Sequence, residues 1–249
     1  MLRRSYQALM DLLDRQPSLK WYYYRLARFC TTNGIHPPLS SRSARVEDSW
    51  RHQHAAHSTR NPLHFVQFDD SIPLLFADVL PFLGQGANIL EIGCNAGRNL
   101  DYLRGQGFSS FTGIEIGSEA EKAMQEHFPA TYAMTRYLVG NAYDEIRKLP
   151  DAAFDLVFAH SVLINIAPKW NGLFREMARV ARGFILTMES EGGITAYPRD
   201  LETMFRRQGF VQILYKYYNL RGQRRVLLPH YDRREVFRNN TIRLFVRET

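Results

Sequence analysis

An apolar run that ends in a glycine-rich turn, "ILEIGCNAGRNL" at residues 89–100, carries a carboxylate, Glu91, inside its expected strand. Such turns let the backbone approach a ligand at a helix N-terminus. A dinucleotide site has the pattern G-x-G-x-x-G, whose third glycine allows close packing of the helix on the strand. The corresponding residues here are Gly93, Asn95 and Arg98, and Glu91 would repel a pyrophosphate. The turn therefore disfavours NAD and FAD, and the Gly-Lys-Ser/Thr of a P-loop is missing.

A cofactor that carries positive charge and no phosphate fits this turn better. S-adenosylmethionine has an ammonium and a sulfonium, so Glu91 can organise the polar groups around its amino acid end while Gly93 lets the backbone approach. Asn95 takes the place of the middle glycine, and asparagine tolerates left-handed backbone well. Glu115 ends the next expected strand, 22 residues after Gly93, where a Rossmann-type sheet places the acid that binds ribose hydroxyls. Two acids at neighbouring strand ends favour an S-adenosylmethionine site.

The elements that must hold these residues follow a strand–helix alternation that begins near "FDDSIPLLFADVLPFL". Such alternation predicts a parallel sheet with helices on its faces. The last two expected strands, "FVQILYKYY" and "TIRLFVRE", have no long helix between them and can pair as an antiparallel hairpin. We therefore expect an α/β, Rossmann-like fold with a mostly parallel seven-stranded sheet, helices on both faces and a C-terminal antiparallel hairpin.

The beginning of the chain has a different pattern. Apolar residues recur at helical spacing over residues 2–13, "LKWYYYRLARFC" follows as a second helix, and "GIHPPLSSRSA" interrupts the pattern. We expect a helical N-terminal extension at 1–48 and the cofactor-binding domain at 49–249. Aromatic and basic residues interleave in "WYYYRLARF", which is typical of membrane-interface and single-stranded nucleic-acid segments. A helix packed on the main domain or on a second subunit is the other interpretation.

Composition narrows the class of protein. The chain has 249 residues, a net charge of +7 and a pI of about 9.5, which favours anionic partners such as phosphorylated substrates, nucleic acid or an acidic membrane surface. The two cysteines exclude a disulfide framework, and the "HQHAAH" run has no carboxylate or cysteine at convincing spacing, so no metal site is expected. No apolar run of about 18 residues and no secretory signal is evident, which predicts a cytoplasmic protein without a transmembrane segment.

The motifs also resemble a known family. "ILEIGCNAGRNL" and "GIEIG" look like the first and second motifs of class I S-adenosylmethionine-dependent methyltransferases, and the likeness covers about residues 60–249. It implies that Asn141, with Ala142 and Tyr143 beside it, lies near the adenine where the family often has an acidic residue. "FDLVFAHSVLINI" resembles the fourth motif, whose strand end faces the methyl group.

A second likeness concerns methyltransferases of bacterial surface-polysaccharide and nonulosonic acid pathways. It rests on "GCNAGRNL", "SVLINI" and the "STRN" that follows Trp50. It implies that Arg60 and Asn61 lie near the cofactor's carboxylate, which Arg60 could bind in a bidentate way; a surface arginine at a helix end is the alternative. The expected cofactor site thus comprises Arg60, Asn61, Glu91, Gly93, Cys94, Asn95, Gly97, Glu115, Ile116, Asn141, Ala142, Tyr143 and His160.

The acceptor site is less defined by the sequence. His160, after the fourth expected strand, is the first candidate for a general base, since its ordinary pKa is near 6.5, and Glu189 is the next. A histidine that only lines the site is the alternative. Arg224 and Arg225 belong to an arginine-rich segment that would bind an anionic acceptor or form a solvated loop.

These observations predict a methyltransferase acting on an oxygen or nitrogen of a small or medium acceptor, with a sugar or sugar phosphate as the leading candidate. The basic charge keeps an RNA or protein methyltransferase as an alternative. A cofactor-binding scaffold without activity is the third interpretation.

Overall fold

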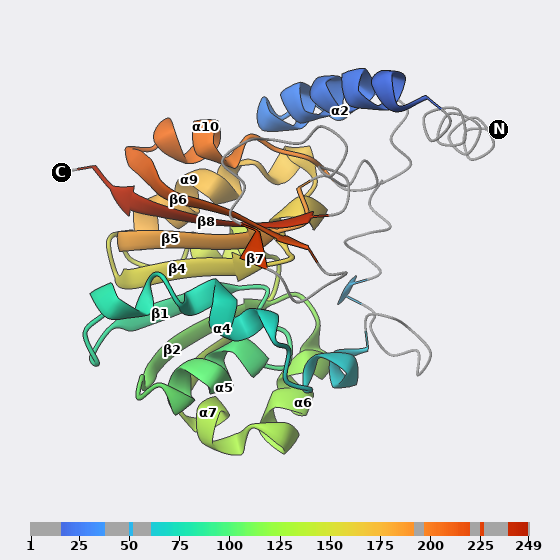
Figure 1. Cartoon of the computed structure of the whole chain (residues 1–249). Helices are drawn as coiled ribbons and strands as arrows, with labels where there is room; N and C mark the ends of the chain where they lie inside the picture. The colour runs from blue at the N-terminus through green and yellow to red at the C-terminus, as the bar shows by residue number, and fades with distance from the viewer. Residues whose placement is uncertain are drawn as a thin grey trace.

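The computed structural model describes residues 16–37, 50–51, 61–191, 197–219, 225–226 and 239–248. Within these ranges one sheet is covered by helices on both faces, as Figure 1 shows. The strands are β1 (Asn88–Ile92), β2 (Ser110–Glu115), β3 (Thr135–Val139), β4 (Phe154–His160), β5 (Ala181–Glu189), β6 (Phe210–Asn219), β7 (Arg225–Val226) and β8 (Asn239–Arg247).

The strand order is β3-β2-β1-β4-β5-β8-β6-β7. The first five of these strands are parallel, whereas β8 is antiparallel to both β5 and β6. The prediction of a mostly parallel sheet with a C-terminal antiparallel pair is confirmed. The seven expected strands are present, and the two-residue β7 is an additional eighth strand that pairs with β6. The strand order reverses at β1 and β4, which is where open α/β sheets bind their ligands.

Helices flank this sheet in two groups. The helix α9 shows why they pack there, because Leu173, Phe174, Met177 and Val180 share one face and each is at most 2% exposed. The α-helices are α2 (Pro17–Thr32), α4 (Ser71–Phe76), α5 (Arg98–Gly105), α6 (Ser118–His127), α7 (Pro129–Ala133), α8 (Ala142–Ile146), α9 (Gly172–Val180) and α10 (Leu201–Arg206). Four short 3-10 turns are η1 (Pro62–Phe65), η2 (Leu80–Phe82), η3 (Leu163–Asn165) and η4 (Pro168–Trp170).

Successive residues of the central strands face two different cores. Leu90 and Ile92 of β1 pack with residues of α8, α9 and α10 on one side of the sheet. Ile89, the residue before Leu90, packs on the other side with residues of α4, α5 and α6. A strand buried on both faces is typical of parallel sheets and explains the continuous apolar runs of this sequence.

The helix α2 lies against the sheet domain instead of standing apart from it. Its inner side chains Tyr24 and Ala27 are each 2% exposed, and its last turn is hydrogen bonded to residues 197–200. The earlier expected helix at 2–13 and most of the linker lie outside the described residues. The boundary near residue 48 therefore remains a prediction. Among the described helices, none has the length and apolar character needed to cross a membrane.

Candidate functional site

A cavity of about 850 Å³ opens at the carboxyl ends of the parallel strands. Its volume falls within the range of small-molecule sites, about 300–1,000 Å³. The lining residues come from the turn after β1, the ends of β2, β3 and β4, the loop at 161–170 and the segment that follows α2. The position agrees with the rule that ligands bind beyond the carboxyl ends of the strands at the switch point.

The glycine turn has the backbone that its sequence predicts. Gly93, Asn95 and Gly97 have φ values of +73°, +46° and +81°, so all three are left-handed. A Cβ atom at Gly93 would lie 2.4 Å from Cγ2 of Val162 in the loop after β4. The turn therefore needs glycine at its first position for conformation and for space, while asparagine at the middle position is tolerated.

Glu115 joins the end of β2 to this turn. Its carboxylate accepts hydrogen bonds from the backbone N–H groups of Ile116 at 2.9 Å, Gly117 at 3.1 Å and Asn95 at 3.2 Å. The side chain lines the cavity and is 5% exposed. A carboxylate held in this way is rigidly oriented toward a ligand.

Glu91 lies beneath the turn and does not line the cavity. Its Oε1 accepts a 2.6 Å hydrogen bond from Nδ2 of Asn99, while Oε2 is buried and finds no partner among the described residues. Burial raises the pKa of Glu91 to about 8, so the carboxyl group holds a proton at pH 7. A cationic ligand in the neighbouring cavity would favour the ionised form of this carboxyl group.

His160, at the end of β4, lines the cavity close to a pair of opposite charges. Burial and the Arg98 guanidinium lower the pKa of His160 to about 4, although Asp69 opposes the shift. Nη2 of Arg98 lies 3.7 Å from Oδ2 of Asp69. His160 is therefore a neutral imidazole at pH 7 and a weak base. Sequence reasoning missed the Arg98–Asp69 pair, because Arg98 stood out only as a missing glycine.

Glu189 is at the end of β5 and is fully buried. Its Oε1 accepts hydrogen bonds from the backbone N–H groups of Val162 at 3.1 Å and Leu163 at 2.9 Å, and its Oε2 from Ile164 at 3.3 Å. Burial raises the pKa of Glu189 to about 8. The structure places this side chain under the loop after β4 and not on the cavity surface, so its contacts support the loop.

Two of the three expected adenine residues line the cavity, and the third lies behind its lining. Asn141 and Ala142 line the cavity, and Oδ1 of Asn141 accepts a 2.9 Å hydrogen bond from the backbone N–H of Tyr143. Tyr143 itself packs on Trp170, with ring centroids 5.6 Å apart. The end of β3 and the start of α8 thus form one end of the cavity.

Of the remaining predicted residues, some line the cavity, some lie outside its lining and some lie outside the described residues. Asn61 accepts a 3.0 Å hydrogen bond from the backbone N–H of Leu63 and so begins η1. Gly97 lies against Met124, whereas Cys94 and Ile116 line the cavity. Arg60 and Arg224 lie outside the described residues, and Arg225 is described only as part of β7.

Another part of the cavity lining consists of residues that the sequence did not indicate. His36 follows α2 and Tyr197 follows β5, and both line the cavity. Nε2 of His36 lies 3.2 Å from the Tyr197 hydroxyl, and the two rings meet edge to face at 5.5 Å. They are 161 positions apart, so no local motif could have revealed the pair.

A buried arginine holds this part of the cavity lining together. Arg199 is 2% exposed, and its Nη1 donates to the backbone carbonyls of Leu163 at 2.8 Å and Tyr197 at 3.2 Å. Its Nη2 donates to the carbonyl of Ile166, and its Nε donates to Oδ1 of Asn171 at 3.1 Å. Burial lowers the pKa of Arg199 to about 9, which still leaves it charged at pH 7. The guanidinium thus joins the loop after β4 to the chain after β5.

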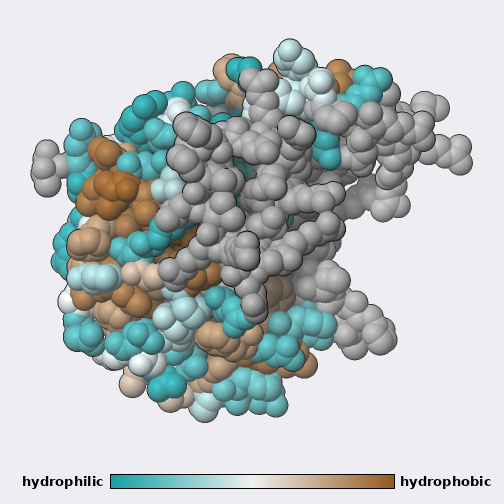
Figure 2. Space-filling view, in the orientation of Figure 1, coloured by the Kyte–Doolittle hydropathy of each residue, from teal (hydrophilic) through white to brown (hydrophobic). Residues whose placement is uncertain are grey.

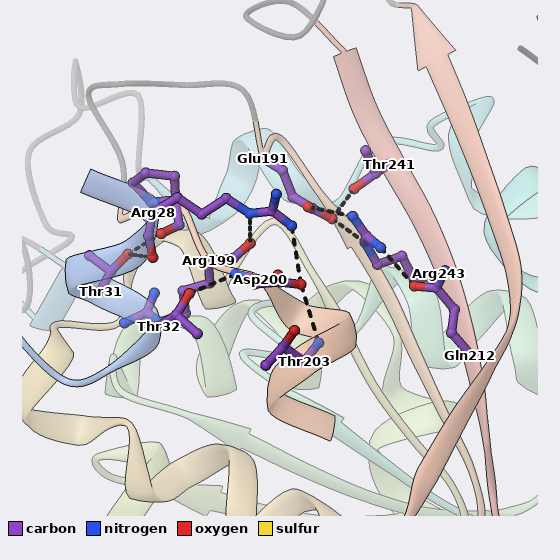
Figure 3. A network of polar contacts seen from close by, with 11 residues as sticks. Arg28, Thr31, Thr32, Glu191, Arg199, Asp200, Thr203, Gln212, Thr241 and Arg243 are labelled. Carbon is purple, nitrogen blue, oxygen red and sulfur yellow. Dashed lines mark hydrogen bonds and ion pairs between the residues drawn. The ribbon is translucent and has the colours of Figure 1, made fainter. Parts of the chain in front are cut away.

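The helix α2 attaches to the same network, as Figure 3 shows. Arg28 donates to the backbone carbonyl of Arg199 at 3.2 Å and forms an ion pair with Asp200 at 3.1 Å. Oγ1 of Thr32 accepts from the backbone N–H of Asp200 at 2.9 Å. The carbonyl of Thr31 accepts from Asn171 at 2.6 Å. The N-terminal helix therefore fixes the position of His36.

The chain is similar to known methyltransferases in part of its sequence and in its fold. Residues 90–183 match the model of a methyltransferase domain family. No curated protein matches the chain. Among solved structures, one chain of the complex between the Haloferax volcanii Trm112 methyltransferase activator and a methyltransferase aligns with a TM-score of 0.60 and 16% identity, over 82% of this chain and 98% of that chain.

Two further structures have the same fold. A sarcosine dimethylglycine methyltransferase from Galdieria sulphuraria aligns with a TM-score of 0.56 and 12% identity, over 72% of this chain and 85% of that one. Magnesium protoporphyrin IX methyltransferase from Synechocystis with bound SAH (S-adenosylhomocysteine) aligns with a TM-score of 0.52 and 17% identity, over 81% and 94%. The matched domain and the shared fold indicate an S-adenosylmethionine-dependent methyltransferase.

Proposed function

We propose that the enzyme transfers a methyl group to an oxygen or nitrogen of a small or medium acceptor bound beside His36 and Tyr197. The observation that carries this proposal is the His36–Tyr197 contact, which lines the cavity beyond β4 and β5. The expected adenine residues lie toward β3, on the other side of the glycine turn. The cavity thus has a cofactor end and an acceptor end.

At the cofactor end, the proposed contacts follow the chemistry of each group. Glu115 is oriented to accept hydrogen bonds from ribose hydroxyls, and Asn141 lies beside the adenine. Asp69 and Arg98 carry the charges opposite to those of an ammonium and a carboxylate, which suits the amino acid end of the cofactor. When bound, the cofactor supplies a methyl group activated by a sulfonium.

At the acceptor end, the task of the protein is to hold the nucleophile in line with that methyl group. Orientation of this kind is worth about 7–11 kcal/mol of the barrier. We assign the removal of the acceptor's proton to His36, whose Nε2 lies within hydrogen-bonding distance of the Tyr197 hydroxyl. His160, whose pKa of about 4 makes it a weak base, is assigned to lining the site.

For the acceptor we favour a sugar or sugar phosphate. The cavity lining includes side chains that hydrogen-bond hydroxyl groups, such as Asn165 and Asn240, and the aromatic rings of Trp50 and Trp170. Lys169 also lines the cavity and provides a cation for an anionic group. Contacts from Arg224 and Arg225 remain part of the hypothesis.

The test is a screen of sugar phosphates, nucleotide sugars and bulk RNA with radiolabelled S-adenosylmethionine. We expect transfer to a carbohydrate and a loss of at least tenfold in kcat/KM for the His36→Gln variant, with unchanged affinity for SAH. Transfer to RNA alone would replace the acceptor class with nucleic acid. Failure of S-adenosylmethionine to bind in a calorimeter would favour the scaffold interpretation.

A further inference from the structure

The outward surface of α2 is apolar. Leu19, Tyr22, Leu26 and Phe29 are spaced by three, four and three residues and are 41%, 67%, 48% and 64% exposed. Residues at this spacing lie on one face of a helix. We call these four residues the α2 face. In Figure 2 the surface along this helix combines a small brown area with pale and teal residues.

The exposure of the α2 face follows from the way the helix is fixed. The opposite side of α2 is buried through Tyr24, Ala27 and Thr31, which are at most 2% exposed. Hydrogen bonds from its last turn to residues 197–200 prevent the helix from rotating. Because the helix cannot turn its apolar residues inward, they remain available for a partner.

The charged residues within residues 16–37 are of one sign. From Gln16 to Pro37 the chain has three cations and no aspartate or glutamate. Arg28 is paired with Asp200, while Arg25 falls between Tyr22 and Phe29 in sequence and is exposed. The net charge of the whole chain is +7.

We propose that the α2 face docks on an anionic lipid surface. Tyrosine and tryptophan concentrate at membrane interfaces, where their rings are buried and their polar atoms stay hydrated. Basic residues next to such side chains are attracted to acidic headgroups. The α2 face, together with Arg25, has both properties on one fixed helix.

A second copy of the chain fits the α2 face less well. A stable protein interface buries about 800 Å² and 20–30 residues on each side, whereas this face has four side chains with Ile35 beyond its end. Two copies meeting through it would also bring their Arg25 side chains together without a compensating acid in residues 16–37. A lipid surface requires neither the larger area nor the acids.

The test is co-sedimentation of the full chain with vesicles of phosphatidylcholine alone and of phosphatidylcholine with phosphatidylglycerol. We expect binding to the mixed vesicles that weakens as salt is added. The Phe29→Glu variant should reduce the partition coefficient at least tenfold. The matched control is Phe82→Glu, since Phe82 is 65% exposed on η2 and Phe29 is 64% exposed.

The outcomes are separate from those of the acceptor screen, because no acceptor is needed. Equal binding of the two variants, or no binding of the wild type to the mixed vesicles, would overturn the lipid assignment. Light scattering after gel filtration provides the second measurement. A dimer that Phe29→Glu dissociates and Phe82→Glu leaves intact would assign the α2 face to a second copy instead.

Discussion

The two ends of the cavity are built in different ways. The cofactor end is made of strand ends and turns, where Gly93, Glu115 and Asn141 each belong to a short segment that runs from a strand into the next helix. The acceptor end is made of segments far apart in the chain, joined by a single buried arginine, Arg199, and by the helix α2. The cofactor end is thus formed by local segments, whereas the acceptor end depends on long-range contacts. Mutations at the two ends should therefore differ in their effects on stability and on cofactor affinity.

The largest effect should come from the acceptor end. In Arg199→Met the carbonyls of Leu163, Tyr197 and Ile166 lose their donor, and leaving buried polar groups without partners is expensive. We expect the free energy of unfolding to fall by about 3–5 kcal/mol, as for other broken buried charge networks. Urea denaturation measures this change. Arg175→Met is the control, because its side chain is 65% exposed. Similar stabilities for the two variants would show that the network does not hold the acceptor end.

At the cofactor end, Gly93→Val should act through the turn alone. The valine would adopt left-handed backbone at a cost of about 1–2 kcal/mol and would collide with Val162. We expect the affinity for SAH, measured by calorimetry, to fall at least a hundredfold. Gly84→Val is the control, since a Cβ there meets nothing within 4 Å. Normal affinity in Gly93→Val would separate the turn from the cofactor site.

A smaller effect is expected at the ribose position. Glu115→Ala should weaken the binding of both SAH and methylthioadenosine by about 1.5–3 kcal/mol, the range for a hydrogen bond to a charged group. Both ligands contain the ribose, so both should lose affinity. Glu119→Ala, on the neighbouring helix α6, should leave both affinities unchanged. A loss confined to SAH would place Glu115 at the amino acid end instead.

The smallest expected effect is the release of part of a proton when the cofactor binds. Burial holds the pKa of Glu91 at about 8, above the ordinary 4.5, so the ligand-free enzyme keeps this carboxyl group protonated at pH 7. A cationic ligand favours the carboxylate and lowers that pKa, so binding S-adenosylmethionine at pH 7 should release a fraction of a proton. Affinity should therefore rise with pH up to about 8. Calorimetry in buffers of different ionisation enthalpy measures the release, and Glu91→Gln should abolish it.

The contrast between the two ends also explains what the sequence could predict. Short-range patterns predict the glycine turn, the position of Glu115 and the mostly parallel sheet. Turn residues and strand periodicity can each be recognised within a few consecutive residues. The helix over "LKWYYYRLARFC" was likewise predictable, and it is α2. No residue pattern indicated β7, since two residues are too few for a periodic pattern.

The acceptor end was not predictable for a physical reason. His36 meets Tyr197 only after α2 has packed on residues 197–200, and no residue pattern near either of them encodes that contact. Glu189 was selected as a candidate because it ends a strand, but its carboxylate is used by the backbone N–H groups of the loop after β4. A carboxylate at a strand end can bind a ligand or the backbone of a neighbouring loop. The full burial of Glu189 leaves it bound to the loop.

The placement of the tryptophans has an optical consequence. Of the three in the chain, Trp50 and Trp170 line the cavity and Trp21 belongs to α2. An adenosine group entering the cavity changes the surroundings of the first two, so intrinsic fluorescence should report cofactor binding without a label or a known acceptor. Trp170→Phe should remove part of that signal, while Trp21→Phe should leave it intact. Fluorescence from Trp21 should instead report on partners that bind α2. One protein sample can therefore report on both the cavity and α2.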